Sequence, residues 1–301
     1  MSLNLETLVC YSENLGIGRT LQILAWKTAL ALSRQVKNSD FVDLYGLRIS
    51  LVAGNQGLSK ELKLFKTHEP LATNIYLKEL KKGMTIADVG SNIGYYALLA
   101  AKRVGSEGKV LAIEPNPVTF KCLERNVASN QLGNVELKQI AAWNKKKVVQ
   151  FEVIPSLNSS RVVDTNIGSK EKTRGRLIHV QATTLDSLLE NYDNVDWLRF
   201  DVEGGEFQII KGATKTLRNL KPNIFMEFHP QLLGAERALE FLRRLQSYGY
   251  EIEYVVTRAA DRSLIAKEKT DIRKTRWDDL IMELTNPMPA YLLLCFSEKV
   301  T

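Results

Sequence analysis

The chain contains 301 residues, of which 45% are hydrophobic and 25% are charged, as is usual for a globular protein with a sizeable core. This length favours one large α/β domain with an extension, or two domains. The net charge of +7 is mild, and the basic stretches are separate from one another, which argues against a nucleic-acid partner. The densest of them are 145–147, 170–176 and 267–276.

Three cysteines, Cys10, Cys122 and Cys295, lie far apart and form no CxxC or Cys/His spacing. This pattern indicates neither a disulfide framework nor a zinc site. The N-terminus lacks the features of a signal peptide, and no apolar run is long enough to span a bilayer. We therefore expect a cytoplasmic protein.

An N-terminal extension is predicted over residues 1–66. Residues 19–37 show the apolar spacing of an amphipathic helix with a basic polar side. We expect this helix to pack on the body of the protein or on a partner chain, with peripheral membrane contact as the alternative. Residues 41–66 suggest short strands with turns at Gly46 and at 54–57.

The main domain is predicted over residues 67–301, where strands alternate with helices. Such alternation predicts a doubly wound, mostly parallel sheet with right-handed crossovers. The predicted strands are 84–90, 109–114, 135–140, 148–154, 177–181, 196–201 and 223–228, and the predicted helices are 71–81, 93–104, 116–130, 184–191, 206–219 and 234–248. The last two strands, 251–258 and 290–297, have no strong helix between them, so we expect them to be antiparallel.

The stretch IADVGSNIGYYALLAA, residues 86–101, joins a strand to a helix through two glycines, Gly90 and Gly94. Glycine lets the backbone take unusual dihedral angles and lets a ligand come close, and the helix N-terminus adds free N–H groups. The next strand ends in Glu114, where an acid can accept hydrogen bonds from both hydroxyls of an adenosine ribose. These features in this order predict a nucleoside-binding site.

The glycine turn also indicates which nucleoside ligand fits. A dinucleotide fingerprint would read GxGxxG, whereas Tyr95 follows Gly94 here, and an acid, Asp88, lies two residues before the first glycine. That acid suits a ligand with positive charge better than a pyrophosphate. S-adenosylmethionine carries both a sulfonium and an ammonium group.

Several motifs together resemble the FkbM family of S-adenosylmethionine-dependent methyltransferases, within the class I Rossmann-like group. They are THEPLATNIY (67–76), GMTIADVGSNIGYYALLAA (83–101), KVLAIEPNP (109–117), LDSLL (185–189), WLRFDVEGGEFQIIKGA (197–213) and PNIFMEFHP (222–230). The resemblance covers roughly residues 40–230 and implies a seven-stranded sheet whose last strand is antiparallel. The family commonly has lysine where this chain has Arg199, which is a mild departure.

The resemblance also implies where the methyl donor binds. It places Gly90, Asn92 and Gly94 along the methionine side of the donor, with Asp88 supporting them. By the same resemblance, Glu114 holds the ribose, and Pro115 and Asn116 flank the adenine. Glu69 either reaches the amino group of the donor or is a surface acid beside Pro70.

The catalytic candidates follow the next two strands, whose carboxyl ends lie on the same edge of the sheet as the glycine turn. They are Asp201, Glu203, Glu227 and His229, and we expect them to orient or deprotonate an acceptor hydroxyl. Oxygen ligands with one imidazole would also suit a divalent metal, which we do not favour. Glu206 is expected to compensate the dipole of the following helix.

These observations favour O-methylation of a hydroxyl on a small molecule, a sugar or a lipid. One alternative is an RNA or protein methyltransferase, although no N-P-P-Y tetrapeptide follows the fourth strand. The others are an NAD-dependent oxidoreductase and a non-catalytic nucleotide-binding module. The sequence leaves the oligomeric state open.

Overall fold

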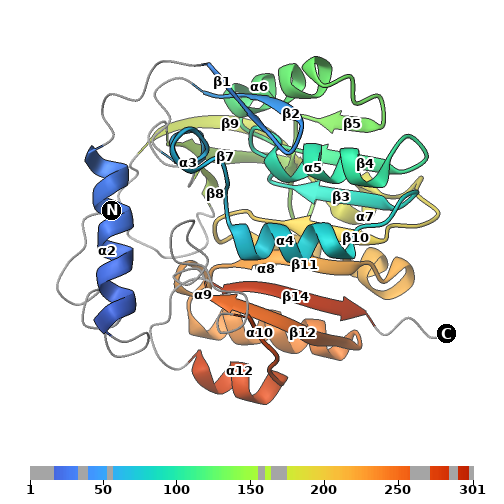
Figure 1. The fold of residues 1–301 in the computed structure, drawn as a ribbon. Coiled ribbons are helices and arrows are strands. Elements are labelled where there is room, and N and C mark those ends of the chain that lie inside the picture. Colours follow the sequence, from blue (N-terminus) through green and yellow to red (C-terminus); the bar gives the residue numbers. More distant parts are fainter. Residues whose placement is uncertain are drawn as a thin grey trace.

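The computed structural model describes residues 17–32, 40–52, 57–154, 160–163, 175–257, 272–284 and 291–297. In this part of the chain the strands of the central sheet follow the order β13-β12-β14-β11-β10-β3-β4-β5. Figure 1 shows the order from β12 to β5. Their bounds are Thr85–Val89 (β3), Lys109–Ile113 (β4), Val135–Lys138 (β5), Trp197–Phe200 (β10), Asn223–Phe228 (β11), Tyr250–Thr257 (β12), Ile272–Arg273 (β13) and Tyr291–Ser297 (β14).

The pairing of these strands confirms the predicted fold class. Strands β5, β4, β3, β10 and β11 are parallel, and β14 inserts antiparallel between β11 and β12. Seven of the eight strands form the predicted sheet, in which the last strand of the chain, β14, is antiparallel to its neighbours. The two-residue strand β13 pairs with β12 and lies at the edge of the sheet. The carboxyl ends of β3, β4, β10 and β11 therefore share one edge, as the site prediction requires.

Helices cover both faces of this sheet, and alternate residues of each strand point into two separate cores. Ile86 and Val110 belong to one core and Ala87 and Leu111 to the other. The first face carries α4 (Pro70–Glu79), α5 (Tyr95–Val104) and α6 (Pro117–Ser129). The second carries α7 (Leu185–Leu188), α8 (Glu206–Lys211), a π-helical turn (Thr216–Leu220), α10 (Ala235–Ser247) and α12 (Trp277–Glu283), with the short α9 (Pro230–Leu233) after β11.

Two predicted strands, 148–154 and 177–181, lie outside the central sheet. They are β7 (Lys147–Val153) and β9 (Arg176–Thr183) of a second sheet with the order β6-β9-β7-β8. Its remaining strands are β6 (Ala141–Ala142) and β8 (Arg161–Val163). The prediction that these two strands belong to the alternating βα units was wrong, because β7 and β9 pair with each other and are antiparallel. The first half of β9 is exposed, which is typical of a sheet with one solvated face.

The N-terminal extension contains a helix and a hairpin, as predicted. Helix α2 (Ile17–Leu32) stands beside the body of the protein, and residues 33–37 of the predicted helix lie outside the described residues (Figure 1). Strands β1 (Phe41–Leu44) and β2 (Leu47–Ser50) form the hairpin, whose turn is at Gly46. None of the described helices is both long enough and apolar enough to cross a membrane.

The rest of the extension differs from the predicted short strands. Residues 58–65 form helix α3 (Leu58–Phe65), because Leu58, Leu62 and Phe65 recur at helical spacing and the first two are buried. Residues 54–56 of the predicted turn at 54–57 lie outside the described residues. The hairpin shares a hydrophobic core with α5 and α6, and the Ser50 N–H donates to Asn126 Oδ1 at 2.7 Å. From β1 onward the extension therefore packs as part of the main domain.

The C-terminal region contains a helix where no strong helix was expected. Helix α12 precedes β14 and buries Trp277 and Leu280 against the second core. The Trp277 indole donates to the carbonyl of Tyr250 at 2.8 Å. This short helix shows little apolar periodicity because its other residues are mostly charged or exposed, so tertiary contacts support it more than its pattern does.

Candidate active site

The turn after β3 is held close to the end of β10, and this approach requires the first glycine. Gly90 has φ +80°, and a Cβ at this position would lie 2.1 Å from the carbonyl oxygen of Asp201. The N–H groups of Gly90 and Ser91 donate to the Ile113 carbonyl at 2.8 and 3.0 Å. Asn92 also has a positive φ, of +52°. The turn is thus fixed between the ends of β4 and β10.

Gly94 has a different role from Gly90. It caps the N-terminus of α5 with φ +94°, and a Cβ there would collide with the side chains of Leu98 and Leu123. Gly94 is also absent from the residues that line the cavity described below. Its glycine therefore serves the packing of α5 against α6, and its predicted contact with a donor remains a prediction.

Glu114 lies at the end of β4 with its carboxylate turned toward the glycine turn. One oxygen accepts the N–H of Asn92 at 2.8 Å, and the other accepts the N–H of Asn116 at 2.8 Å and the hydroxyl of Thr119 at 3.0 Å. Burial raises the pKa of Glu114 to about 7, against the opposing effect of these hydrogen bonds. The oxygen that accepts only the Asn92 N–H keeps acceptor capacity for a hydroxyl of a ligand.

One cavity joins this turn to the acidic ends of the neighbouring strands. Gly90, Asn92, Glu114, Pro115 and Asn116, which belong to the predicted donor site, line it. Residues of the second sheet from β6, β7 and β8 line it as well. Further lining residues are His68, Tyr95, Tyr96, Thr119, Trp143, Phe151, Val153, Arg161, Val162 and Arg199.

The predicted donor residue Glu69 does not line this cavity, whereas its neighbour His68 does. The His68 ring lies between Glu61 and Glu69, at 2.9 and 3.2 Å, and Glu69 accepts the Tyr96 hydroxyl at 2.7 Å. Burial alone would lower the pKa of His68, but the two carboxylates raise it to about 10. Glu69 is thus a buried acid in an ionic cluster, which excludes the surface alternative.

Asp88 is buried below the turn and paired with Arg199. The Arg199 guanidinium donates to Asp88 Oδ1 at 3.1 Å, to the Gly90 carbonyl at 3.2 Å and to Asp201 Oδ2 at 3.3 Å. The same group lies 4.4 Å from the centroid of the Tyr96 ring. Asp88 does not line the cavity, so it supports the turn through Arg199, a residue whose part in the site the sequence did not reveal.

Three of the four predicted catalytic residues form an acidic wall of the same cavity. Asp201, Glu203 and Glu227 all line it, and they come from the loop after β10 and from β11. Burial raises the pKa of Asp201 to about 6 and that of Glu203 to about 8, and the neighbouring carboxylates add to both shifts. The convergence that we predicted from the strand ends is therefore present.

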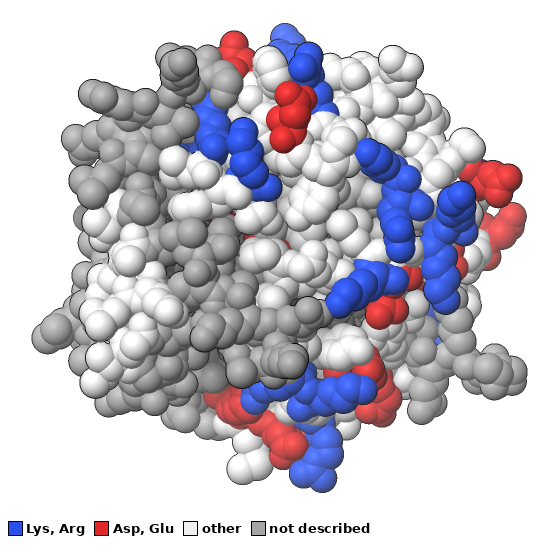
Figure 2. Space-filling view, viewed as in Figure 1, with Lys and Arg blue, Asp and Glu red and all other residues white. Residues whose placement is uncertain are grey.

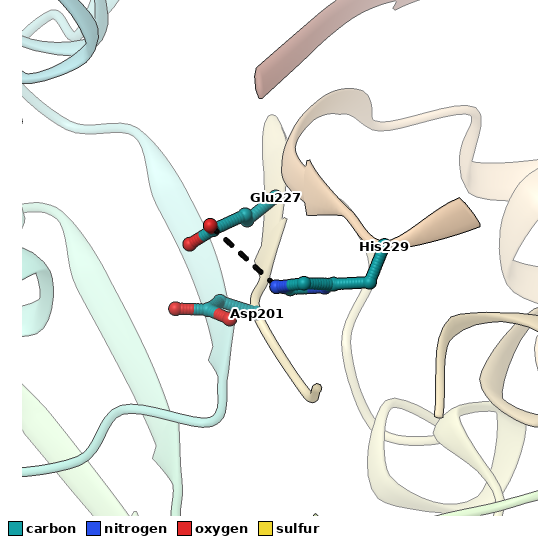
Figure 3. A group of neighbouring side chains, drawn as sticks. All are labelled: Asp201, Glu227 and His229. Carbon is teal, nitrogen blue, oxygen red and sulfur yellow. Dashed lines mark ion pairs between the residues drawn. The ribbon is translucent and has the colours of Figure 1, made fainter. Parts of the chain in front are cut away.

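The fourth predicted residue, His229, lies behind this wall rather than in it. Its ring points toward Glu227 and Asp201 from the segment after β11 (Figure 3). The Nε2 atom is 3.5 Å from Glu227 and 3.6 Å from Glu203, while the side chain is 4% exposed and does not line the cavity. Direct contact of His229 with an acceptor is thus less favoured than contact of the carboxylates.

The other ring nitrogen of His229 binds Glu206. Nδ1 is 2.5 Å from Glu206 Oε1, and the Glu206 side chain is 0% exposed. The same oxygen accepts the N–H of Gly204 at 3.2 Å. Glu206 does lie in the first turn of α8, as the dipole interpretation requires, but its hydrogen bond to His229 is a contact that the sequence spacing did not indicate.

Asp201, Glu227 and His229 each offer an atom within 4.8 Å of the others, a spacing that could hold a metal ion. Burial alone would lower the pKa of His229, but Glu203 and Glu206 raise it well above the ordinary value. A metal ion at this place would have to displace a proton from the ring, because a ligating imidazole nitrogen carries none.

Comparison with known proteins places this geometry in a family. The FkbM methyltransferase domain matches residues 88–252, which include the glycine turn and the acidic wall. The methyltransferase sdnD of Sordaria araneosa is 28% identical over 195 residues, or 56% of this chain and 73% of that protein. The hexuronic acid methyltransferase AglP of Haloferax volcanii is 27% identical over 157 residues, or 52% of this chain and 60% of its own length.

A solved FkbM methyltransferase from Methylobacillus flagellatus overlaps 93% of this chain and 60% of its own, with a TM-score of 0.44 and 12% identity. That overlap is too weak to bear on function. The domain match covers more than half of the chain and carries the assignment. The chain belongs to the FkbM family and is a methyltransferase.

Proposed function

We propose that this methyltransferase transfers a methyl group from S-adenosylmethionine to a hydroxyl of a small molecule, a sugar or a lipid. One observation carries the proposal: a single cavity is lined both by the glycine turn with Glu114 and by the carboxylates Asp201, Glu203 and Glu227. A donor held by the first group would present its methyl group to an acceptor held by the second.

The residues around the glycine turn fit the donor. Glu114 Oε2, which accepts one hydrogen bond within the protein, can accept another from a ribose hydroxyl, and Pro115 and Asn116 also line the cavity. The Gly90 turn leaves backbone where a side chain would stand, and the nearby carboxylates suit a cationic ligand. S-adenosylmethionine, when bound, supplies a methyl group that is already activated by its sulfonium.

The protein then has to align the acceptor, exclude water and take up the hydroxyl proton. Asp201 and Glu203 are suited to different tasks, because their pKa values are raised to about 6 and about 8. Asp201 has the lower pKa of the two and is the better suited to accept the proton, whereas Glu203 keeps its proton to higher pH and is suited to donate a hydrogen bond. We assign the general base to Asp201, with Glu203 and Glu227 orienting the acceptor.

The acceptor class rests on the chemistry of the acidic wall. Carboxylates are good partners for hydroxyl groups, and the name of the relative AglP gives a hexuronic acid as its substrate. An RNA or protein acceptor remains the alternative. On the face seen in Figure 2, Lys and Arg side chains lie in separate groups, several with acidic neighbours, which gives that alternative little support. Family membership sets aside the oxidoreductase and the non-catalytic module.

Two measurements test the proposal. Calorimetry should show binding of S-adenosylmethionine and S-adenosylhomocysteine, and no binding of NAD. Transfer of labelled methyl groups should then be screened over sugars, lipids and hydroxylated small molecules, with tRNA and protein as the other arms. Transfer to a hydroxyl that Asp201→Asn abolishes supports the proposal, whereas transfer only to RNA or protein would overturn it.

A further inference from the structure

We propose that Glu206 is a positioning residue, which fixes the ring of His229 and through that ring holds the acidic wall of Asp201, Glu203 and Glu227 in its working arrangement. The proposal rests on the proposed function, since it gives Glu206 a part in preparing the acceptor end of the cavity. It replaces the expectation that Glu206 serves only the dipole of α8.

The hydrogen bond between Glu206 and His229 sets the orientation of the ring. Glu206 Oε1 accepts the Gly204 N–H at 3.2 Å and lies 2.5 Å from His229 Nδ1, so this nitrogen carries the proton and donates it. The ring plane then directs Nε2 to the opposite side, where Glu203 and Glu227 lie at 3.6 and 3.5 Å. A carboxylate that orients a histidine in this way is a common arrangement behind catalytic groups.

Burial of Glu206 argues against a role for the dipole alone. An acid that compensates a helix dipole can do so from the surface, where water solvates its charge. Glu206 is 0% exposed, and α8 has only six residues. A fully buried carboxylate is costly unless it is paired, and among the described residues its ion pair is with His229. The pair is therefore the reason that this residue is an acid.

The charge of the ring connects Glu206 to the cavity. The groups that face His229 are Glu206 from α8, Glu227 from β11, and Asp201 and Glu203 from the loop after β10, with Arg199 beyond Asp201. Glu203 and Glu206 favour the protonated ring, and the protonated ring lowers the pKa of both Asp201 and Glu203. Without Glu206 the ring would lose part of its charge, and Asp201, whose pKa the charged ring lowers, would hold its proton to higher pH.

The test compares Glu206→Gln with a matched control, Asp186→Asn. Asp186 is also an acid in the first turn of a short helix, but it binds Lys215 and Thr216 and does not line the cavity. The ring nitrogens of His229 are followed by ¹⁵N NMR, with the signals assigned by their loss in His229→Gln. Donor binding by calorimetry and the pH profile of methyl transfer complete the set.

We expect both ring nitrogens of His229 to carry protons in the unaltered protein well above the pH range in which a histidine ordinarily titrates. In Glu206→Gln the midpoint of the ring titration should fall by about one pH unit or more, and the acid limb of the transfer profile should move to higher pH. Donor affinity should change by less than about threefold, because Glu206 does not line the cavity. Asp186→Asn should leave the ring titration and the profile unchanged.

The proposal is overturned if the ring of Glu206→Gln titrates as in the unaltered protein, or if the acid limb does not move. If Glu206→Gln fails to fold, the titration of His229 in the unaltered protein still tests the proposal. A ring that titrates near the ordinary histidine pKa of about 6.5 would refute the charged pair. The ring measurement needs no acceptor. A shifted titration without hydroxyl methylation would therefore support the Glu206–His229 pair while overturning the proposed acceptor class.

Discussion

Replacing Glu114 by glutamine should weaken donor binding by about 30- to 150-fold. The carboxylate is held by three donors, from Asn92, Asn116 and Thr119, and in the complex it would also accept from the ribose. An amide turns one acceptor oxygen into an N–H₂ group, which then faces at least one of these donors. The loss of charge-assisted hydrogen bonds to the ribose corresponds to about 2–3 kcal/mol, which is the stated change in Kd.

Calorimetry with S-adenosylhomocysteine measures this change, with Glu136→Gln as the matched control. Glu136 is half exposed on β5 and does not line the cavity, so its variant should bind as the unaltered protein does. Because burial raises the pKa of Glu114 to about 7, donor affinity should also fall as the pH drops through that value. Glu114→Gln should lack this pH dependence. An affinity within about threefold of the unaltered protein would refute the role of Glu114.

Three further predictions concern the support of the turn and the chemistry. Gly90→Ala should destabilise the fold by about 2–4 kcal/mol in denaturant titrations, because its φ is positive and its Cβ would meet the Asp201 carbonyl, whereas Gly133→Ala, with open space around it, should change stability by less than about 1 kcal/mol. Arg199→Met should cost about 3–5 kcal/mol in the same assay by leaving Asp88 buried without its cation, and a cost below about 1 kcal/mol would contradict the pairing. Asp201→Asn should lower turnover about 10²- to 10⁴-fold while donor binding persists, and full turnover would exclude Asp201 as the base.

The sequence predicted the parts of the site that follow from strand order. Parallel strands bring their carboxyl ends to one edge, so Glu114, Asp201 and Glu227 could be expected to meet although they are far apart in the chain. The glycine turn was also recognisable, because Gly90 follows the end of a predicted strand. Its backbone does take a positive φ there.

Side-chain depth was not predictable in this way. Alternation placed Glu227 and His229 on one face, but it could not show that Glu227 lines the cavity while His229 lies behind it. Arg199 reaches Asp88 across a pair of neighbouring strands, 111 residues apart in the chain, and nothing near either residue marks that contact. Glu206 was ambiguous because a helix start accounts for an acid there without any partner.

Stretches of weak periodicity account for the remaining errors. Helix α3 has only eight residues, of which Leu58 and Leu62 point inward. Such a short apolar pattern does not distinguish a helix from a strand. Strands β7 and β9 fit the order of alternating units, yet they pair with each other in a separate sheet that closes the cavity. Which strands pair is decided by long-range packing, which a local pattern does not contain.

A crystal structure with bound S-adenosylhomocysteine tests the central claim most directly, because it locates both ends of the donor at once. The account predicts the ribose hydroxyls on Glu114 and the sulfur directed along the cavity toward Asp201, Glu203 and Glu227. A donor bound away from Glu114, or one whose sulfur faces away from the three carboxylates, would contradict it.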